Sequence, residues 1–142
     1  MAVVVSACLL GENCKWDGGN NRNERVVAFC AGKEVIPVCP EVAGGLPVPR
    51  APSEIREGRV TAKDGADVDA AFRMGAQKSL ALCEGKTIEL AILKARSPSC
   101  GKGCVYDGSF SGALVHGDGV FAAMLQERGI PVFTEAEEWT AE

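Results

Sequence analysis

The sequence has no long hydrophobic run. Its apolar stretches, such as 1–5 and 35–38, are far shorter than the roughly 20 residues that a membrane-spanning helix requires. The sequence also lacks a basic N-terminal region followed by an apolar stretch and a cleavage site, which a secretory signal would need. We therefore expect a cytoplasmic protein that does not cross a membrane.

An excess of positive charge is also missing. The chain has 15 Lys and Arg residues against 19 Asp and Glu residues, which gives a net charge of -4. A broad nucleic-acid-binding surface needs a positive potential, so the sequence argues against one. At 142 residues, of which 46% are hydrophobic, the chain is long enough to bury a core. We expect one domain that spans residues 1–142.

Histidine is scarce, and closely spaced cysteine pairs are absent. There is one histidine, His116, and no Cys-x-x-Cys pair, whereas structural zinc sites usually combine such pairs. The chain nevertheless has seven cysteines, and disulfides are rare in the cytoplasm. Metal binding or sulfur chemistry is therefore the leading interpretation of these cysteines. We expect His116 to be a polar loop residue rather than a ligand.

Predicted strands alternate with predicted helices along the chain. Short apolar runs indicate strands at 3–5, 34–38, 90–93 and 130–133, and helices are expected over 24–30, from 67 or 69 to 83, and over 120–128. This alternation predicts a three-layer, Rossmann-like α/β fold with a mainly parallel sheet of about four or five strands and helices on both faces. A short hairpin is expected around 59–67, and the proline-rich segment 40–52 is expected to be an ordered loop without regular structure.

Three cysteines, Cys8, Cys39 and Cys100, lie in loops that follow predicted strands. In an open parallel sheet, ligands collect at the carboxyl ends of the strands, where the loops converge. The three thiolates can therefore meet at one edge of the sheet. Three dispersed cysteines are compatible with an iron–sulfur cluster of four irons, one of which has no protein thiolate. That open iron would be the reactive position.

The other four cysteines have different expected roles. Cys30 and Cys83 lie on predicted helices, and we expect them to be small core residues, because free cysteine is among the most buried residue types. Cys14 and Cys104 are intermediate cases. Either can replace one of the three proposed ligands or act as a nearby thiol that handles sulfur.

Polar residues near the three cysteines are suited to proton transfer. Glu41 lies two residues after Cys39 and is predicted to be a general acid or base. Ser97 and Ser99 precede Cys100 and can donate hydrogen bonds to a polar substrate, although serines beside proline also form ordinary turns. Two further loop residues are weaker candidates for lining a pocket: Asn21 and Arg50.

Five motifs together resemble one known family. They are Ser-Ala-Cys-Leu-Leu-Gly at 6–11, Cys-Lys-Trp-Asp-Gly at 14–18, Val-Cys-Pro-Glu at 38–41, Gly-Gly-Leu-Pro at 44–47 and Arg-Ser-Pro-Ser-Cys-Gly at 96–101. Over essentially its whole length the chain resembles the thiouracil desulfidase family. The resemblance implies a [4Fe-4S] cluster on three cysteines, with the fourth iron free to bind the sulfur of a thiolated pyrimidine. By motif the ligands would be Cys8, Cys39 and Cys100, with Cys14 as the alternative.

The resemblance also implies an activity, the removal of sulfur from a thiolated base or nucleoside such as 2-thiouracil. We expect the open iron to act as a Lewis acid on the C–S bond while Glu41 activates water, without net electron transfer. Sulfur would leave as hydrosulfide, with Ser97 stabilising charge or moving a proton. Ser99, Asn21 and Arg50 would contact the substrate. Two other functions are alternatives: a non-enzymatic iron–sulfur or sulfur carrier, and a structural zinc module.

Overall fold

The computed structural model describes residues 1–139, so that the last three residues of the predicted domain lie outside the described part. Its centre is a parallel sheet of four strands in the order β2-β1-β5-β8. The strands are β1 (Ala2–Ser6), β2 (Glu34–Val38), β5 (Ile88–Leu93) and β8 (Val132–Thr134). All four strands point the same way, so their carboxyl ends meet at one edge of the sheet.

Strand β1 lies inside the sheet and is buried on both faces. Its residue Val4 lies opposite Ile36 of β2 on one side and opposite Ala91 of β5 on the other. The run 3–5 consists of valines without any exposed surface. A strand covered on both faces is expected to read as a continuous apolar run rather than an alternating one, and β-branched residues suit it.

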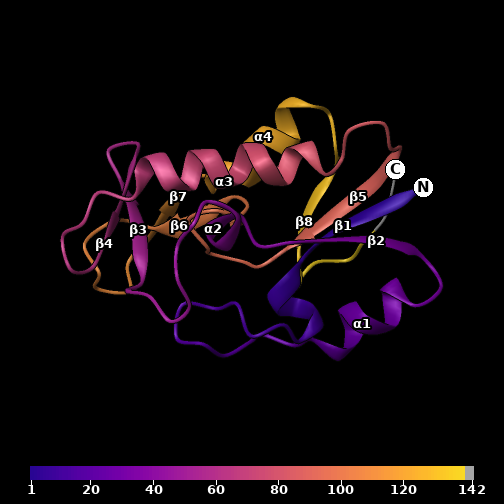
Figure 1. The fold of residues 1–142 in the computed structure, drawn as a ribbon, viewed down its shortest axis with the longest axis horizontal. Coiled ribbons are helices and arrows are strands. Elements are labelled where there is room, and N and C mark those ends of the chain that lie inside the picture. The colour runs from indigo at the N-terminus through magenta and orange to yellow at the C-terminus, as the bar shows by residue number, and fades with distance from the viewer. Residues whose placement is uncertain (140–142) are drawn as a thin grey trace.

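Helices cover both faces of the sheet, as Figure 1 shows. Helix α1 (Glu24–Cys30) packs against one face, and α3 (Asp69–Ala81) and α4 (Val120–Glu127) pack against the other. Helix α1 begins where predicted, because Oδ1 of Asn23 accepts hydrogen bonds from the first backbone amides of the helix. The predicted three-layer α/β class is confirmed. No helix within residues 1–139 is long and apolar enough to span a membrane.

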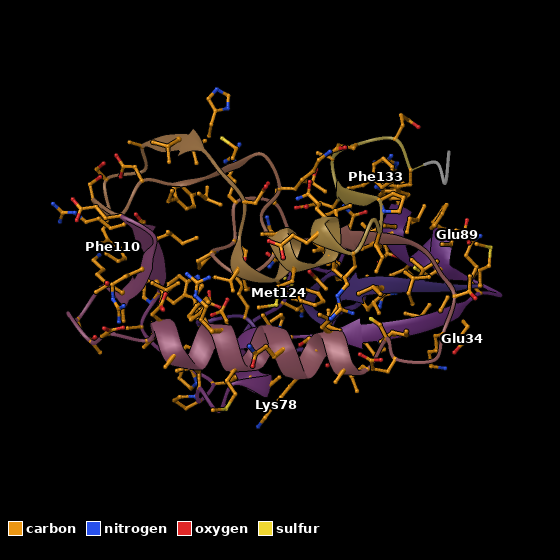
Figure 2. All side chains as sticks on the ribbon, turned by 90° about the horizontal axis from the view of Figure 1, so that it is seen from above. Glu34, Lys78, Glu89, Phe110, Met124 and Phe133 are labelled. Atoms are coloured by element: carbon orange, nitrogen blue, oxygen red, sulfur yellow. The ribbon has the colours of Figure 1, made fainter. Side chains whose placement is uncertain are left out.

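Two antiparallel hairpins extend the molecule beyond the carboxyl edge of the sheet (Figure 1). They are formed by β3 (Ser53–Arg56) with β4 (Arg59–Ala62), and by β6 (Cys104–Tyr106) with β7 (Leu114–His116). In Figure 2, Phe110 lies at this end of the molecule, whereas Glu34 and Glu89, near the starts of β2 and β5, lie at the other. The first hairpin turns at Glu57 and Gly58, which have positive φ values of 51° and 79°. The predicted hairpin around 59–67 is also present in short form, because Thr61 pairs antiparallel with Asp67 and Ala62 N donates to the carbonyl oxygen of Ala66 at 2.8 Å. The second hairpin was not predicted.

Two segments near the predicted cysteines differ from the expectation. Pro40–Ala43 form a short helix, α2, within the segment expected to have no regular structure, because proline fits the first position of a helix. Cys8 lies in a 3-10 helix, Ala7–Leu10, rather than in an open loop. Cys8 and Cys39 nevertheless remain at the edge of the sheet where they were expected. Elsewhere, Cys83 lies just beyond the end of α3 rather than inside the helix, and it is half-buried.

Helix α2 is held against α3 by two glycines. A Cβ atom on Gly75 of α3 would overlap the backbone oxygen of Pro40, and one on Gly44 would overlap that of Ala71. The two backbones can approach this closely only because neither glycine has a side chain. The position of Glu41 on α2 therefore depends on this contact.

Candidate functional site

A cavity of about 530 Å³ opens at the carboxyl edge of the sheet. Its walls come from the residues that follow β1, β2, β5 and β8 and from the segments 14–21 and 50–54. All nine proposed site residues line it: Cys8, Cys14, Asn21, Cys39, Glu41, Arg50, Ser97, Ser99 and Cys100. Within residues 1–139, Cys104 and His116 lie elsewhere, opposite each other on the β6–β7 hairpin. The sheet edge thus brings together residues that lie far apart in the sequence.

The three proposed thiolate ligands follow three neighbouring strands. Cys8 lies two residues after β1, Cys39 follows β2 directly, and Cys100 lies in the loop that follows β5. Because β2, β1 and β5 are adjacent in the sheet, their ends are about 4.8 Å apart from strand to strand. Cys14 reaches the same cavity from the loop beyond the 3-10 helix and is buried. Cys8, Cys14, Cys39 and Cys100 are all free thiols.

The loop that carries Cys100 is fixed by helix α4. The first amides of α4 have no partner within the helix, and Val120 N and Phe121 N donate to the carbonyl oxygens of Pro98 and Ser99 at 2.9 and 2.8 Å. Cys100 is consequently only 4% exposed and packs against the core. Cys100 thus lies in a loop, as predicted, but the loop is packed under α4 and the cysteine is part of the core.

Burial and hydrogen bonds set the acidity of the thiols. Burial raises the pKa of Cys100 to about 12. Burial also raises the pKa of Cys8, while the hydrogen bond from Nδ2 of Asn21 to Cys8 Sγ, at 3.4 Å, acts in the opposite direction. Cys39 Sγ lies 3.8 Å from the carbonyl oxygen of Cys14, to which it donates. The interaction between the two thiols raises the pKa of Cys14 and lowers that of Cys39 to about 7. Cys39 is therefore the most acidic thiol in the cavity.

Two serines form a hydrogen-bonded chain to Glu41. Ser97 Oγ accepts from the backbone amides of Ser99 and Cys100, both at 3.1 Å, and lies 3.0 Å from Ser99 Oγ. Ser99 Oγ lies 3.3 Å from Glu41 Oε2 and donates to it. Ser99 is only 1% exposed, and all its contacts are within the protein. These contacts favour a role for Ser99 in holding Glu41 rather than in touching a substrate.

The Arg50 side chain also makes its hydrogen bonds to groups within the protein. Its Nε donates to Glu41 Oε1 at 2.9 Å, and its two terminal nitrogens donate to the carbonyl oxygens of Cys14 and Pro47 at 2.9 and 3.1 Å. The side chain is 7% exposed. Arg50 thus joins the Cys14 loop to helix α2, and its contacts favour a supporting role over the substrate contact that we expected.

An ion pair that sequence reasoning missed completes the wall of the cavity. Lys94 Nζ lies 2.9 Å from Glu135 Oε2, and both residues line the cavity. Glu135 directly follows β8, as Cys39 directly follows β2. The rule that functional groups gather at the carboxyl ends of parallel strands points to this position, but it does not reveal the partner of Glu135.

The geometry fits a cluster better than a single ion. Within residues 1–139, no three His, Cys, Asp or Glu side chains lie close enough together to hold one metal ion. This spacing gives no support to a structural zinc site, whose ligands surround a single ion. In a four-iron cluster each thiolate binds a different iron, so the sulfurs lie farther apart. The donor set and the cavity that it shares are compatible with such a cluster.

Taken together, fold and site define an α/β protein with a thiol-lined cavity at the carboxyl edge of a parallel sheet. The family model described as 2-thiouracil desulfurase matches residues 3–137. The chain therefore belongs to the 2-thiouracil desulfurase family, as its motifs suggested.

Two known proteins are similar over nearly the whole chain. An uncharacterized protein of Bacillus subtilis (strain 168), YbbK, is 36% identical over 145 residues, which cover 95% of this chain and 96% of the relative. A solved structure, described as the [4Fe-4S]-dependent thiouracil desulfidase TudS, is 43% identical with a TM-score of 0.88. The match covers 94% of this chain and 90% of that one.

Proposed function

We propose that this protein is a [4Fe-4S]-dependent desulfidase that removes sulfur from thiolated pyrimidines such as 2-thiouracil. The observation that carries the proposal is that thiols from three neighbouring strands share one cavity with the hydrogen-bonded carboxylate of Glu41. The solved structure of the [4Fe-4S]-dependent thiouracil desulfidase TudS, at 43% identity, supports the same cofactor and reaction class. The protein would act as a single domain in the cytoplasm on a small thiolated base or nucleoside.

Cys8, Cys39 and Cys100 are the proposed ligands of the cluster. They follow three adjacent strands, whereas Cys14 comes from a separate loop, and its interaction with Cys39 raises the pKa of the Cys14 thiol. Asn21 donates to the sulfur of Cys8 at 3.4 Å, and such a donor stabilises a thiolate. When bound, the cluster supplies a Lewis-acidic iron for the sulfur of the substrate.

Glu41 is the proposed general base. It takes a proton from a water molecule, whose oxygen then attacks the ring carbon that bears the sulfur. The C–S bond breaks, the sulfur leaves with its electron pair as hydrosulfide, and the carbon keeps the oxygen, so no net electron transfer occurs. Arg50 and Ser99 each hold one oxygen of the Glu41 carboxylate, which fixes its direction in the cavity.

Ser97 is the proposed proton carrier next to Glu41. Its oxygen already accepts two backbone hydrogen bonds, which leaves its own proton for Ser99 Oγ. Ser99 in turn donates to Glu41 Oε2. This chain runs toward Glu41 and keeps its carboxylate ready to accept a proton. For the proton to return along it, both hydroxyl groups would reverse and Ser97 would release one backbone hydrogen bond, after which Ser97 could pass the proton to the leaving sulfur or the ring.

The proposal is tested by anaerobic reconstitution with iron and sulfide, followed by assay of hydrosulfide release from 2-thiouracil and related thio-bases and thionucleosides. Glu41→Gln should retain iron and lose about 10²- to 10⁴-fold in rate, the usual contribution of a general base. Glu34→Gln, at the start of β2 and outside the lining of the cavity, is the matched control and should keep full activity.

Three outcomes would contradict parts of the proposal. If the loaded protein released no hydrosulfide from any compound but passed iron or sulfur to an acceptor protein, it would be a carrier. If it bound zinc and took up no iron, the cluster would be wrong. If Glu41→Gln were as active as Glu34→Gln, Glu41 would not be the base.

A further inference from the structure

The ion pair between Lys94 and Glu135 is held in the wall of the cavity. The ammonium and the carboxylate are 2.9 Å apart, and the two side chains are 29% and 16% exposed. Both residues line the cavity together with Cys8. Neither residue has a part in the proton transfer described above. A partly buried charge pair in this position needs a reason, because removing both charges from water is costly.

The backbone around Lys94 is fixed on both sides of its Cα atom. Its own amide donates to Ser6 Oγ, at the end of β1, at 3.0 Å. The next amide, of Ala95, donates to Glu135 Oε1 at 2.8 Å. One carboxylate therefore holds the backbone after β5 with one oxygen and the ammonium with the other.

Glu135 is itself held by helix α1 and does not belong to a loose tail. Arg25 of α1 donates to the carbonyl oxygens of Glu135 and Glu137 at 3.1 and 2.6 Å. The same guanidinium lies 4.1 Å from the ring centre of Trp139, whose ring packs edge to face with Phe29. A cation over an indole ring is a favourable contact. The segment 135–139 is thus anchored at several points, and this anchoring determines where Lys94 lies.

The geometry points to Lys94 as the residue that offsets the negative charge of the bound cluster, with Glu135 as its positioning residue. This inference rests on the proposed function, because three thiolates would bring three negative charges into a partly dry cavity. Of the charges that act on the Cys8 thiol, Lys94 favours the thiolate and Glu135 opposes it. Three other cations line the cavity: Arg50 holds Glu41 and acts on Cys39, Lys15 is paired with Asp17 at 3.6 Å, and Arg96 is exposed and screened by water.

The charge of its surroundings shifts the reduction potential of a cluster, which gives a measurement independent of turnover. A nearby cation favours the reduced, more negative state. Lys94→Gln should therefore shift the midpoint potential to more negative values, and Glu135→Gln should shift it to more positive values. Glu135→Gln keeps an oxygen that can accept from Ala95 N, so the backbone contact is preserved. Lys94→Arg keeps the charge and should restore the wild-type potential.

Lys102 provides the matched control. Its ammonium lies 3.2 Å from Glu137 on the same segment and it is 33% exposed, close to the exposure of Lys94, but it does not line the cavity. Lys102→Gln should leave the potential unchanged. Hydrosulfide release should fall by about tenfold in Lys94→Gln, less than the loss expected for a donor in direct contact with the reacting atoms.

The experiment measures the midpoint potential of the reconstituted proteins at equal iron content. Shifts of opposite sign in Lys94→Gln and Glu135→Gln support the inference, because a merely structural defect has no reason to change sign. Equal potentials in Lys94→Gln and Lys102→Gln overturn it, even if the wild type releases hydrosulfide. If Lys94→Gln does not take up iron, the absence of a positive shift in Glu135→Gln overturns it. If the potentials shift as expected but the wild type releases no hydrosulfide, the desulfidase proposal is refuted and the inference about Lys94 stands.

Discussion

Arg50 and Glu41 form a buried ion pair in which Nε of the arginine donates to Oε1 of the carboxylate at 2.9 Å. The same guanidinium donates to the carbonyl oxygen of Cys14 at 2.9 Å. The Arg50 side chain therefore fixes the direction of the Glu41 carboxylate and also holds the loop that carries Cys14. Sequence alone assigned Arg50 to the substrate, and the contacts assign it to the support of Glu41.

Replacing Arg50 by alanine should therefore affect both stability and rate. Arg50→Ala leaves the carboxylate of Glu41 partly buried without its cation, so the free energy of unfolding should fall by roughly 3 kcal/mol. Urea unfolding measures this change. Hydrosulfide release by the folded, iron-loaded variant should fall by at least about tenfold, because the carboxylate loses the partner that directs it.

Arg59 is the matched control for this substitution. It pairs with Asp67 at 2.7 Å, but the two side chains are 64% and 57% exposed. An exposed pair contributes about 0 to 1 kcal/mol, so Arg59→Ala should unfold almost like the wild type. Similar losses of stability in Arg50→Ala and Arg59→Ala would show that the pair of Arg50 and Glu41 contributes no more to the free energy of unfolding than an exposed pair.

The ligand set predicts which cysteines are needed for the cluster. Cys8→Ser, Cys39→Ser and Cys100→Ser should each lose most of the iron and the brown absorption near 400 nm that we expect of the reconstituted wild type, because serine replaces the thiolate that the cluster needs. Cys14→Ser should retain iron, and Cys104→Ser, on the β6–β7 hairpin, is the control. Iron and absorbance after reconstitution measure the outcome. Loss of iron in Cys14→Ser with retention in one of the three others would move the ligand assignment to Cys14.

Gly75 gives a test of how helix α2 is placed. In an exposed helix, Gly→Ala normally stabilises by about 1 kcal/mol. Here the new Cβ would overlap the backbone oxygen of Pro40, so Gly75→Ala should destabilise the fold by about 1 to 3 kcal/mol and displace Glu41. Gln77→Ala, at an exposed position of the same helix, should be nearly neutral. Urea unfolding of both variants measures these changes in stability. A stabilised Gly75→Ala would mean that α2 and α3 do not approach this closely.

Much of the fold could be predicted because local signals agreed with the packing. Helix α1 spans the predicted residues 24–30, since Asn23 both caps it and precedes an apolar face. Strand β2 spans the predicted residues 34–38. The rule that ligands gather at the carboxyl ends of strands placed Cys8, Cys39 and Cys100 at one edge of the sheet, and all three line the cavity there.

The remaining features depend on contacts that no local pattern encodes. Strands β6 and β7 are three residues long each, too short for an alternating pattern to be recognised. The roles of Arg50 and Ser99 depend on which atoms they meet, and Ser99 and Glu41 are 58 residues apart in the chain. Glu135 was missed because a carboxylate after a strand is also an ordinary surface residue unless its partner is known.

The cluster-free protein should be modified first at Cys39. A thiolate reacts with alkylating agents and a thiol does not, and the interaction with the Cys14 thiol lowers the pKa of Cys39 to about 7. As the pH rises through 7, alkylation of Cys39 by iodoacetamide should therefore increase and then level off. Burial raises the pKa of Cys8 and Cys100, so these thiols should react more slowly at pH 7.

Peptide mass spectrometry after short exposures at pH 6, 7 and 8 measures this order. Cys14→Ala removes this thiol, so the pKa of Cys39 should rise and its alkylation at pH 7 should slow. Cys30→Ala is the control, because Cys30, the last residue of helix α1, lies in the core and does not line the cavity. If Cys39 reacted no faster than Cys8 in the wild type, or at the same rate with and without Cys14, the interaction between the two thiols would not set the acidity of Cys39. In that case Cys14 would be free to act as a ligand, and the three-cysteine assignment would lose its main structural argument against a fourth thiolate.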